Sequence, residues 1–174
     1  MARTEVRPLC SDDYATVMKL EDEVFGAAGE AVLGPYYVKL CCEFFGQTCL
    51  LALVGGEPAG YVLSFVRGRE AYCTTLAVVP RFQGSRVAIR LVGGLIGALE
   101  PIVDSCWFTV KQDNASARAI HGALGAKDVE VRRDFYWPGD ERIVSRIDRA
   151  GLEAARGRLE RLGLVPREPL SGAA

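Results

Sequence analysis

The sequence contains few of the features that bind metals, cross membranes or direct export. Its one histidine is His121, and its six cysteines include no Cys-x-x-Cys pair, so these residues do not form a zinc site. Its charge-free apolar runs, such as residues 91–99, are much shorter than the ~20 residues that a membrane-spanning helix needs. The first residues lack the apolar centre of a signal peptide. We therefore expect a cytoplasmic protein with buried, free thiols and no bound metal.

An excess of charge of either sign is also absent. The 21 basic and 22 acidic residues give a formal net charge of −1. Because nucleic-acid binding needs a basic excess, this balance argues against a nucleic acid as partner. What is present is an ordinary globular composition, with 49% apolar and 25% charged residues. At 174 residues, the chain is long enough to bury a sizeable core in one domain.

Hydrophobic periodicity and turn residues predict a regular alternation of elements. Strands are expected at 3–8, 49–54, 60–66, 70–79, 104–110, 129–136 and 143–147, and helices at 11–25, 35–45, 87–99, 114–124 and 149–162. This order predicts an α/β (α+β) fold with a mixed, mostly antiparallel central sheet and helices on both faces. Residues 1–148 are expected to form the main domain, and residues 149–174 an extra C-terminal helix and a frayed tail packed on it.

The segment from Leu76 to Ala88 carries the clearest chemical signal. A buried strand ends at Pro80, a loop with one glycine and one serine follows, and a helix begins near Arg86. The unpaired N–H groups of such a helix start point outward together, and the helix dipole favours negative charge there. The pattern predicts a phosphate-binding loop, with Arg81 and Arg86 as added charges. A strand-loop-helix turn with a purely structural role has the same pattern, so both interpretations stay open at this point.

The order of elements and this loop resemble the GNAT superfamily of acyl-CoA-dependent N-acetyltransferases. The family's loop, Gln/Arg-x-x-Gly-x-Gly/Ala, falls on Gln83-Gly84-Ser85-Arg86-Val87-Ala88, with Arg86 in place of the central glycine. The resemblance implies that backbone amides of residues 84–88 hold the pyrophosphate of acetyl-CoA. It also implies that Leu76, Ala77 and Val78 pair with the pantetheine arm as an added strand. Because glycine permits the closest approach, Arg86 either contacts a phosphate itself or weakens the site.

A second match lies on the later helix. The family's Asn-x-x-Ala-x-x-Leu-Tyr-x-x-x-Gly-Phe lands on Asn114, Ala117, Ile120, His121, Gly125 and Ala126. The resemblance implies that Asn114 caps this helix and contacts the cofactor together with Ala117. It places His121 where the family often has the tyrosine that protonates the departing thiolate. The hairpin at 132–146 resembles the family's last strands, so the likeness covers about residues 4–147.

A narrower resemblance concerns residues 34–49. Gly34-Pro35-Tyr36-Tyr37, followed by Phe44-Phe45 and Thr48-Cys49, is similar to a stretch of the ectoine-pathway diaminobutyrate acetyltransferases. This likeness implies a small, amino-acid-like amine as the acceptor.

Amide formation from a thioester needs a neutral amine, an oxyanion donor and a proton for the leaving sulfur. The resemblance makes the main-chain N–H of Val78 the candidate oxyanion donor, where the strand splays from its neighbour. His121 and Tyr136 compete as the acid. Imidazole titrates near neutrality, and Tyr136 offers a hydroxyl on a strand beside the expected cleft. Each has a plainer alternative, His121 as a polar group on a helix flank and Tyr136 in packing.

Candidate acceptor-binding residues come from the first helices and the central strand. Glu21 shares the apolar face of its helix, and Glu30 lies near a helix-helix junction, so both are candidates to bind a cationic acceptor. Acids at such places are most often only solvated. Tyr36 is a candidate to line the same pocket. Tyr72, with Thr74 and Leu76, is expected on one face of the central strand, where water chains to the hydroxyls could carry a proton.

Together with the resemblance, the sequence predicts an enzyme, an acetyl-CoA-dependent N-acetyltransferase. It would move the acetyl group to a primary amine of a small metabolite by direct attack in a ternary complex. The expected partner is a small-molecule amine, with no nucleic acid and no membrane, and the last helix is a candidate homodimer contact. Two alternatives stay open. One is an acyl-CoA-binding module without turnover, suggested by Arg86 and His121, and the other is a protein or peptide N-acetyltransferase.

Overall fold

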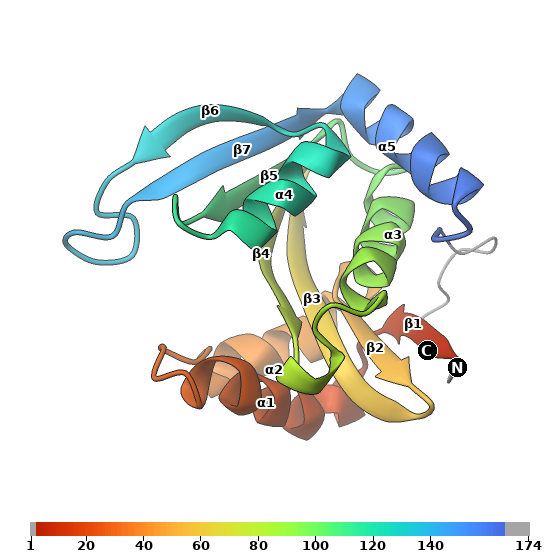
Figure 1. The fold of residues 1–174 in the computed structure, drawn as a ribbon, viewed down its shortest axis with the longest axis vertical. Helices are drawn as coiled ribbons and strands as arrows, with labels where there is room; N and C mark the ends of the chain where they lie inside the picture. Colours follow the sequence, from red (N-terminus) through yellow and green to blue (C-terminus); the bar gives the residue numbers. More distant parts are fainter. Residues whose placement is uncertain (1–2, 166–174) are drawn as a thin grey trace.

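The computed structural model describes residues 3–165, which form a layered fold around one seven-stranded sheet (Figure 1). The strands follow one another across the sheet as β1 (Thr4–Pro8), β2 (Leu50–Val54), β3 (Glu57–Arg67), β4 (Glu70–Val78), β5 (Ser105–Val110), β7 (Arg142–Asp148) and β6 (Lys127–Arg132). In this described sheet only β4 and β5 run parallel, and all other neighbours run antiparallel. The expected mixed, mostly antiparallel sheet is confirmed.

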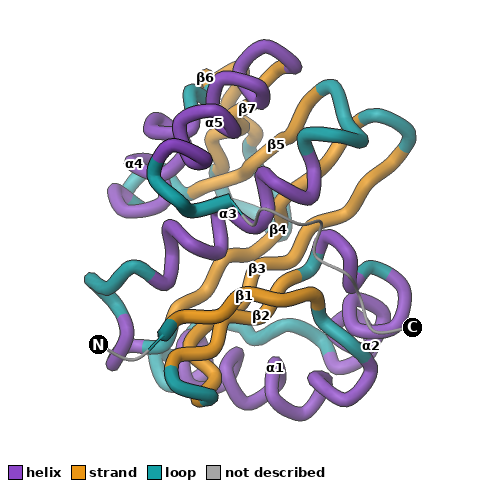
Figure 2. Tube along the Cα trace, turned by 90° about the vertical axis from the view of Figure 1, so that its right-hand side faces the viewer, coloured by secondary structure: helices purple, strands orange, loops and turns teal. Residues whose placement is uncertain are grey.

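Helices cover both faces of the sheet, as expected (Figure 2). The helices α1 (Tyr14–Glu21) and α2 (Pro35–Phe44) pack on one face, and α3 (Val87–Leu99), α4 (Ala115–Leu124) and α5 (Arg149–Arg161) lie on the other. Each layer buries its own apolar cluster against the sheet, because alternate side chains of a strand point to opposite faces. No helix in the described part of the chain is long and apolar enough to cross a membrane.

The C-terminal helix packs on α3. Leu152, Ala155 and Leu159 of α5 belong to the same buried cluster as the almost wholly apolar α3. Gly93 permits the close approach of the segment after α5, since a Cβ there would lie 2.3 Å from the Leu164 carbonyl oxygen. The expected extra helix is therefore confirmed. The expected fraying falls mostly on residues 166–174, which lie outside the described residues.

The sheet opens between its two parallel strands. β4 and β5 pair only where Glu70–Cys73 of β4 lie beside Ser105–Phe108 of β5. The second half of β4 pairs with β3 alone. Figure 1 shows β4 and β5 diverging beyond this point. The pairing of β3 and β4 also shifts by one residue at Thr74, which makes Thr74 the extra residue of a β-bulge. The result is a V-shaped opening with β4 and β5 as its two walls.

The bulge corrects one expectation about side-chain direction. Leu76 packs against the α3 cluster, whereas the Thr74 hydroxyl contacts Tyr37 of α2 on the opposite face. The expected shared face of Tyr72, Thr74 and Leu76 is therefore wrong for Leu76. The physical reason is the extra residue, which breaks the period-two alternation between Thr74 and Leu76.

A second correction concerns the strand expected at 129–136. β6 is Lys127–Arg132, and residues 133–141 form a loop in which Tyr136 lies. Asp134 has φ of +53°, and its carboxylate accepts from the Gly139 N–H at 2.6 Å. This local turn diverts the chain before Tyr136.

The helix expected at 11–25 is likewise broken, into a 3-10 turn, α1 and the π-helix Asp22–Gly26.

The cysteines are free, as predicted. Five of them are buried and Cys10 is half-buried. In the part of the chain that the structure describes, no group of three or more His, Cys, Asp or Glu residues is arranged to hold a metal ion.

Candidate active site

The turn between β4 and α3 forms the expected loop at the start of a long helix. After a 3-10 turn at Pro80–Phe82, Gly84 has φ of +74°, the left-handed region that glycine adopts without strain. Arg86 has φ of −81° and ψ of 6°. Any L-residue adopts this conformation, so an arginine at this position leaves the loop backbone undistorted.

Several N–H groups of this loop have no acceptor among the described residues. They belong to Gly84, Arg86 and Ala88, while those of Ser85 and Val87 are engaged inside the loop. The Val87 N–H donates to the Ser85 hydroxyl at 3.3 Å. Free N–H groups at a helix start carry partial positive charge and point away from the helix. The loop therefore retains an anion-binding character, with part of its donors already used.

Two side chains near the loop, those of Gln83 and Arg81, are held by other protein groups. Gln83 donates its Nε2–H to the Val78 carbonyl at 3.1 Å and so ties the loop to the end of β4. Arg81 forms ion pairs with Glu23 and with Glu57, the latter at 2.8 Å. The expectation that Arg81 adds free charge to the loop is therefore wrong. Its cation is taken by acids that are distant in sequence and close in space.

The direction of the Val78 N–H follows from its neighbour in β4. The Val79 N–H donates to the Ala59 carbonyl at 3.0 Å, on the β3 side. Because successive N–H groups of a strand point to opposite sides, that of Val78 is directed into the opening toward β5. Leu76 shares this direction. The backbone edge of residues 76–78 is thus free for an added strand-like ligand, with one carbonyl used by Gln83.

The start of α4 is capped as predicted. The Asn114 side-chain oxygen accepts from the Ala117 N–H at 3.0 Å, and Gly125, at φ of +86°, ends the helix. On the same helix, the His121 ring lies 4.6 Å from the Phe108 ring of β5. Its Nδ1 is buried and has no hydrogen-bond partner among the described residues. Burial lowers the pKa of His121, so the ring is mainly neutral at pH 7.

Hydroxyl groups cluster on the opposite face of the sheet. The Tyr72 hydroxyl lies 2.7 Å from the Thr109 hydroxyl and 3.3 Å from that of Tyr136. The Tyr37 and Thr74 hydroxyls lie 2.7 Å apart. Burial raises the pKa of Tyr37 and of Tyr72, so both stay protonated at neutral pH. These groups form a hydrogen-bonded lining next to the bulge of β4.

Glu21 is an anchoring residue in this geometry. Its side chain is almost fully buried and accepts hydrogen bonds from the Tyr61 hydroxyl and from the Leu33 N–H, the latter at 2.8 Å. These bonds tie the segment between α1 and α2 to β3. Burial raises the pKa of the Glu21 carboxyl. Both of its oxygens are occupied, so the structure does not present Glu21 as an open counter-charge for an acceptor.

The other two candidates from this region point outward. Glu30 is exposed, and Tyr36 is 78% exposed at the start of α2. Its neighbour Tyr37 turns inward and contacts β4 through Thr74. The structure thus brings Tyr37, Tyr72 and Tyr136 together and leaves Tyr36 and Glu30 at the surface.

Replacing Glu21 with alanine is expected to lower the free energy of unfolding by about 2–4 kcal/mol, because it leaves two buried donors unpaired and opens a cavity. Glu21→Gln keeps the shape and an acceptor, so its loss should be smaller. Urea unfolding measures both, with Glu43→Ala on the outer face of α2 as the surface control. Equal stability of Glu21→Ala and Glu43→Ala would show that the anchor contributes nothing.

The same carboxyl gives a pH dependence with a definite sign. Since its folded-state pKa is raised, the folded protein binds a proton that the unfolded chain has already released. The free energy of unfolding of the native protein therefore falls as pH rises through the window between the two pKa values. Glu21→Gln should remove this slope, and parallel curves for the two proteins would contradict it.

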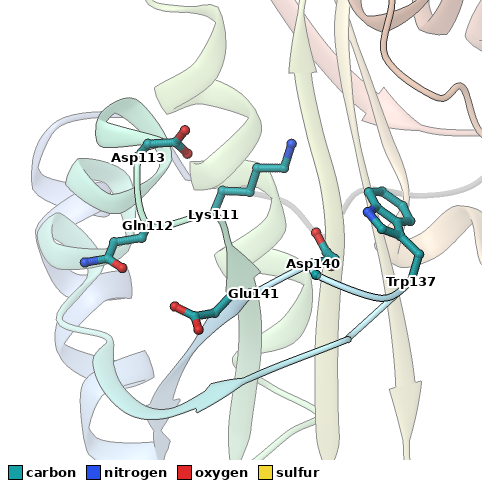
Figure 3. A pocket seen from close by; sticks show the side chains of 7 residues that line it. Lys111, Gln112, Asp113, Trp137, Asp140 and Glu141 are labelled. Atoms are coloured by element: carbon teal, nitrogen blue, oxygen red, sulfur yellow. The ribbon is translucent and has the colours of Figure 1, made fainter.

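Residues without a sequence-based prediction also border the site. A pocket of about 540 Å³ lies between the β5–α4 turn and the loop that joins β6 to β7 (Figure 3). It is lined by Lys111, Gln112, Asp113, Trp137, Gly139, Asp140 and Glu141. The alternation of side chains along a strand is the one signal that could have indicated Lys111, because it follows Thr109 by two positions and so continues the same side of β5.

The profile of the Acetyltransferase (GNAT) family matches residues 13–126, and the chain belongs to this family. The family and fold expected from the sequence are confirmed. Among curated proteins, the [ribosomal protein bS18]-alanine N-acetyltransferase of Escherichia coli (strain K12) is 32% identical over 88 residues. The aligned stretch covers 50% of this chain and 60% of that relative's length.

Solved structures share the fold over most of its extent. The ribosomal-protein-S18-alanine N-acetyltransferase from Escherichia coli has a TM-score of 0.70 at 20% identity, covering 84% of this chain and 94% of that one. The diaminobutyrate acetyltransferase EctA from Paenibacillus lautus, solved with L-2,4-diaminobutyric acid and coenzyme A, has a TM-score of 0.72 at 18% identity, covering 85% of this chain and 96% of that one. At such identities the likeness shows the fold.

Proposed function

We propose that the protein transfers the acetyl group of acetyl-CoA to a primary amine of a small molecule. The observation that carries this function is the opening between β4 and β5, with the free N–H groups of the α3 start at its end. Family membership and the coenzyme A bound in EctA, a protein of the same fold, support acetyl-CoA as the co-substrate.

The cofactor is proposed to lie along β4. The N–H groups of Gly84, Arg86 and Ala88 bind its diphosphate, aided by the helix dipole. Its pantetheine arm pairs with the free edge of residues 76–78 through main-chain hydrogen bonds. Asn114 keeps its amide N–H₂ for a contact with the arm, while its oxygen caps α4 at Ala117.

The chemistry then follows from groups on the two faces. The neutral amine attacks the thioester carbonyl carbon, and the Val78 N–H donates to the oxygen that gains negative charge. The amine proton leaves through water held by the hydroxyls of Tyr72 and Thr109. The carbon–sulfur bond breaks, and the thiolate takes a proton from the imidazolium form of His121, the minor form at pH 7 because burial lowers the pKa of the ring. The neutral ring that remains takes up a proton from solvent before the next turnover. Tyr136 lies on the acceptor side of the sheet, so we assign it to the lining and His121 to the leaving group.

A second candidate acceptor is the N-terminal amine of a protein. The specific observation in its favour is the 32% identity to an enzyme named for the alanine of a ribosomal protein. Exposed aromatic side chains at the rim, with Tyr136 at 54% and Trp137 at 51% exposure, also suit a peptide. The two candidates share every step of the chemistry and differ in the shape of the acceptor.

Calorimetric titration with acetyl-CoA tests the first half of the proposal, and binding below millimolar concentration is expected. Release of the CoA thiol in the presence of a panel of small amines and of peptides with free N-termini tests the second half. Turnover excludes the alternative of a binding module without catalysis. Binding without turnover on either panel would establish that alternative, and no binding at millimolar ligand would overturn the proposal.

Arg86→Ala is expected to weaken acetyl-CoA binding by less than tenfold, because the backbone of residue 86 already has an unstrained conformation and supplies its N–H in both proteins. The same titration measures it. A much larger loss would mean that the guanidinium, in addition to the backbone, binds a phosphate.

A further inference from the structure

The pocket at the end of β5 is lined by one cationic side chain, that of Lys111. Lys111 forms no ion pair within 4 Å among the described residues. Three acids line the same pocket: Asp113 is exposed, and Asp140 and Glu141 each pair with an arginine, although Asp140 also attracts Lys111. Asp140 is buried and paired with Arg142 at 2.9 Å, and Glu141 pairs with Arg133 at 3.6 Å.

The side chains of the pocket are oriented in two directions (Figure 3). The Lys111 ammonium and the Trp137 ring extend to the same side, where the Asp140 carboxylate also lies between them. Glu141 and Gln112 extend to the other side. The space beside Lys111 is therefore bordered by its ammonium, by the Asp140 carboxylate and by an aromatic ring.

This space is continuous with the proposed acceptor side. Lys111 follows Thr109 by two residues, so its side chain continues the same face of β5. Two residues of extended chain separate the two Cα atoms by about 7 Å. The Thr109 hydroxyl contacts Tyr72, which in turn lies 3.3 Å from the Tyr136 hydroxyl. The rings of Tyr136 and Trp137 are 5.9 Å apart. One loop thus borders both the hydroxyl lining and the pocket.

We propose that this pocket binds a carboxylate carried by the acceptor, and that Lys111 is the specificity-determining residue for it. The proposal rests on the proposed function, because it names the chemical class of acceptor: an amine with a carboxylate several bonds away. An ammonium without an ion pair gains from a carboxylate a charge-assisted hydrogen bond that a simple alkylamine or diamine cannot offer.

Matched acceptor pairs test this proposal. γ-Aminobutyrate is compared with butylamine, and ornithine with putrescine, its decarboxylated counterpart. The native protein is expected to favour the carboxylate member at least tenfold in kcat/KM. Lys111→Met should remove the preference through KM, and Lys111→Glu should invert it in favour of putrescine. Lys127→Glu, the same charge change on exposed β6, is the control and should keep the native preference.

Two peptides determine the source of the carboxylate. A preference for an N-terminal Ala-Asp peptide over Ala-Asn, lost in Lys111→Met, would place the carboxylate on a peptide side chain. The same loss confined to the amino acids would place it on a free metabolite. Either result supports Lys111 as the reader of the carboxylate.

The outcomes separate this proposal from the proposed function. Acetyl transfer with equal preferences in the native protein and Lys111→Glu would overturn the role of Lys111 and leave the transferase standing. Absence of transfer to any amine would overturn the transferase. The pocket is then still tested by binding, since γ-aminobutyrate should shift the backbone amide resonances of residues 111–113, 137 and 139–141 in the native protein and not in Lys111→Met. Equal shifts in both proteins would overturn it.

Discussion

Gly84→Val is expected to weaken acetyl-CoA binding by at least about 100-fold. A β-branched residue disfavours φ of +74°, so the loop must relax to another conformation, which redirects the N–H groups of Gly84, Arg86 and Ala88. A hydrogen bond to a charged group contributes about 1.5–3 kcal/mol, so the loss of two such bonds exceeds 100-fold in affinity. Calorimetric titration with acetyl-CoA measures the change.

The matched control is Gly56→Val in the turn between β2 and β3. Gly56 has φ of +86°, and a Cβ there, as at Gly84, meets no atom within 4 Å. Both variants therefore carry a similar backbone strain of about 1–2 kcal/mol and no steric clash. Only the variant at Gly84 should lose acetyl-CoA. If both bind the cofactor like the native protein, the loop amides do not hold its diphosphate.

The fold could be predicted from the sequence because its signals are local. Three features each depend only on residues that are close in sequence. They are the Gly-Gly turn at 55–56, the apolar face of α3 and the cap at Asn114. The order of these elements along the chain then predicts a mixed, mostly antiparallel sheet. Such features can be predicted without knowing the tertiary structure, since helix propensity and capping involve only a few neighbouring residues.

The parts of the site that sequence reasoning missed depend on distant contacts. Arg81 looked free beside the loop, yet its partner Glu23 lies 58 positions away. The bulge at Thr74 inserts one residue and reverses the faces of all residues after it, and the local pattern gives no sign of it. Lys111 lines a pocket only because the loop between β6 and β7 folds next to the end of β5. Contacts between residues that are distant in sequence determine where these side chains point and what they bind.

His121 lowers the stability of the folded protein, and a role in catalysis would explain why a histidine lies there. Its buried Nδ1 has no partner in the described structure, and such a group costs about 1–3 kcal/mol. Phenylalanine would pack against Phe108 without this cost. The folded-state pKa of His121 is lowered, so the unfolded chain binds a proton first as pH falls. The free energy of unfolding of the native protein therefore falls as pH drops below about 6.5, and His121→Phe should remove this slope.

His121→Phe is accordingly expected to be at least as stable as the native protein near pH 6 and to lose about 100-fold in kcat, the usual effect of removing a general acid. Its affinity for acetyl-CoA should stay within about threefold, because no free N–H of the loop changes. Thiol release at saturating acceptor gives kcat, and titration gives the affinity. His121→Tyr, which places a hydroxyl donor at this point of α4, should keep part of the rate that His121→Phe loses. Unchanged kcat in His121→Phe would eliminate the imidazole as the acid and leave Tyr136, tested in the same way as Tyr136→Phe, as the donor to the thiolate.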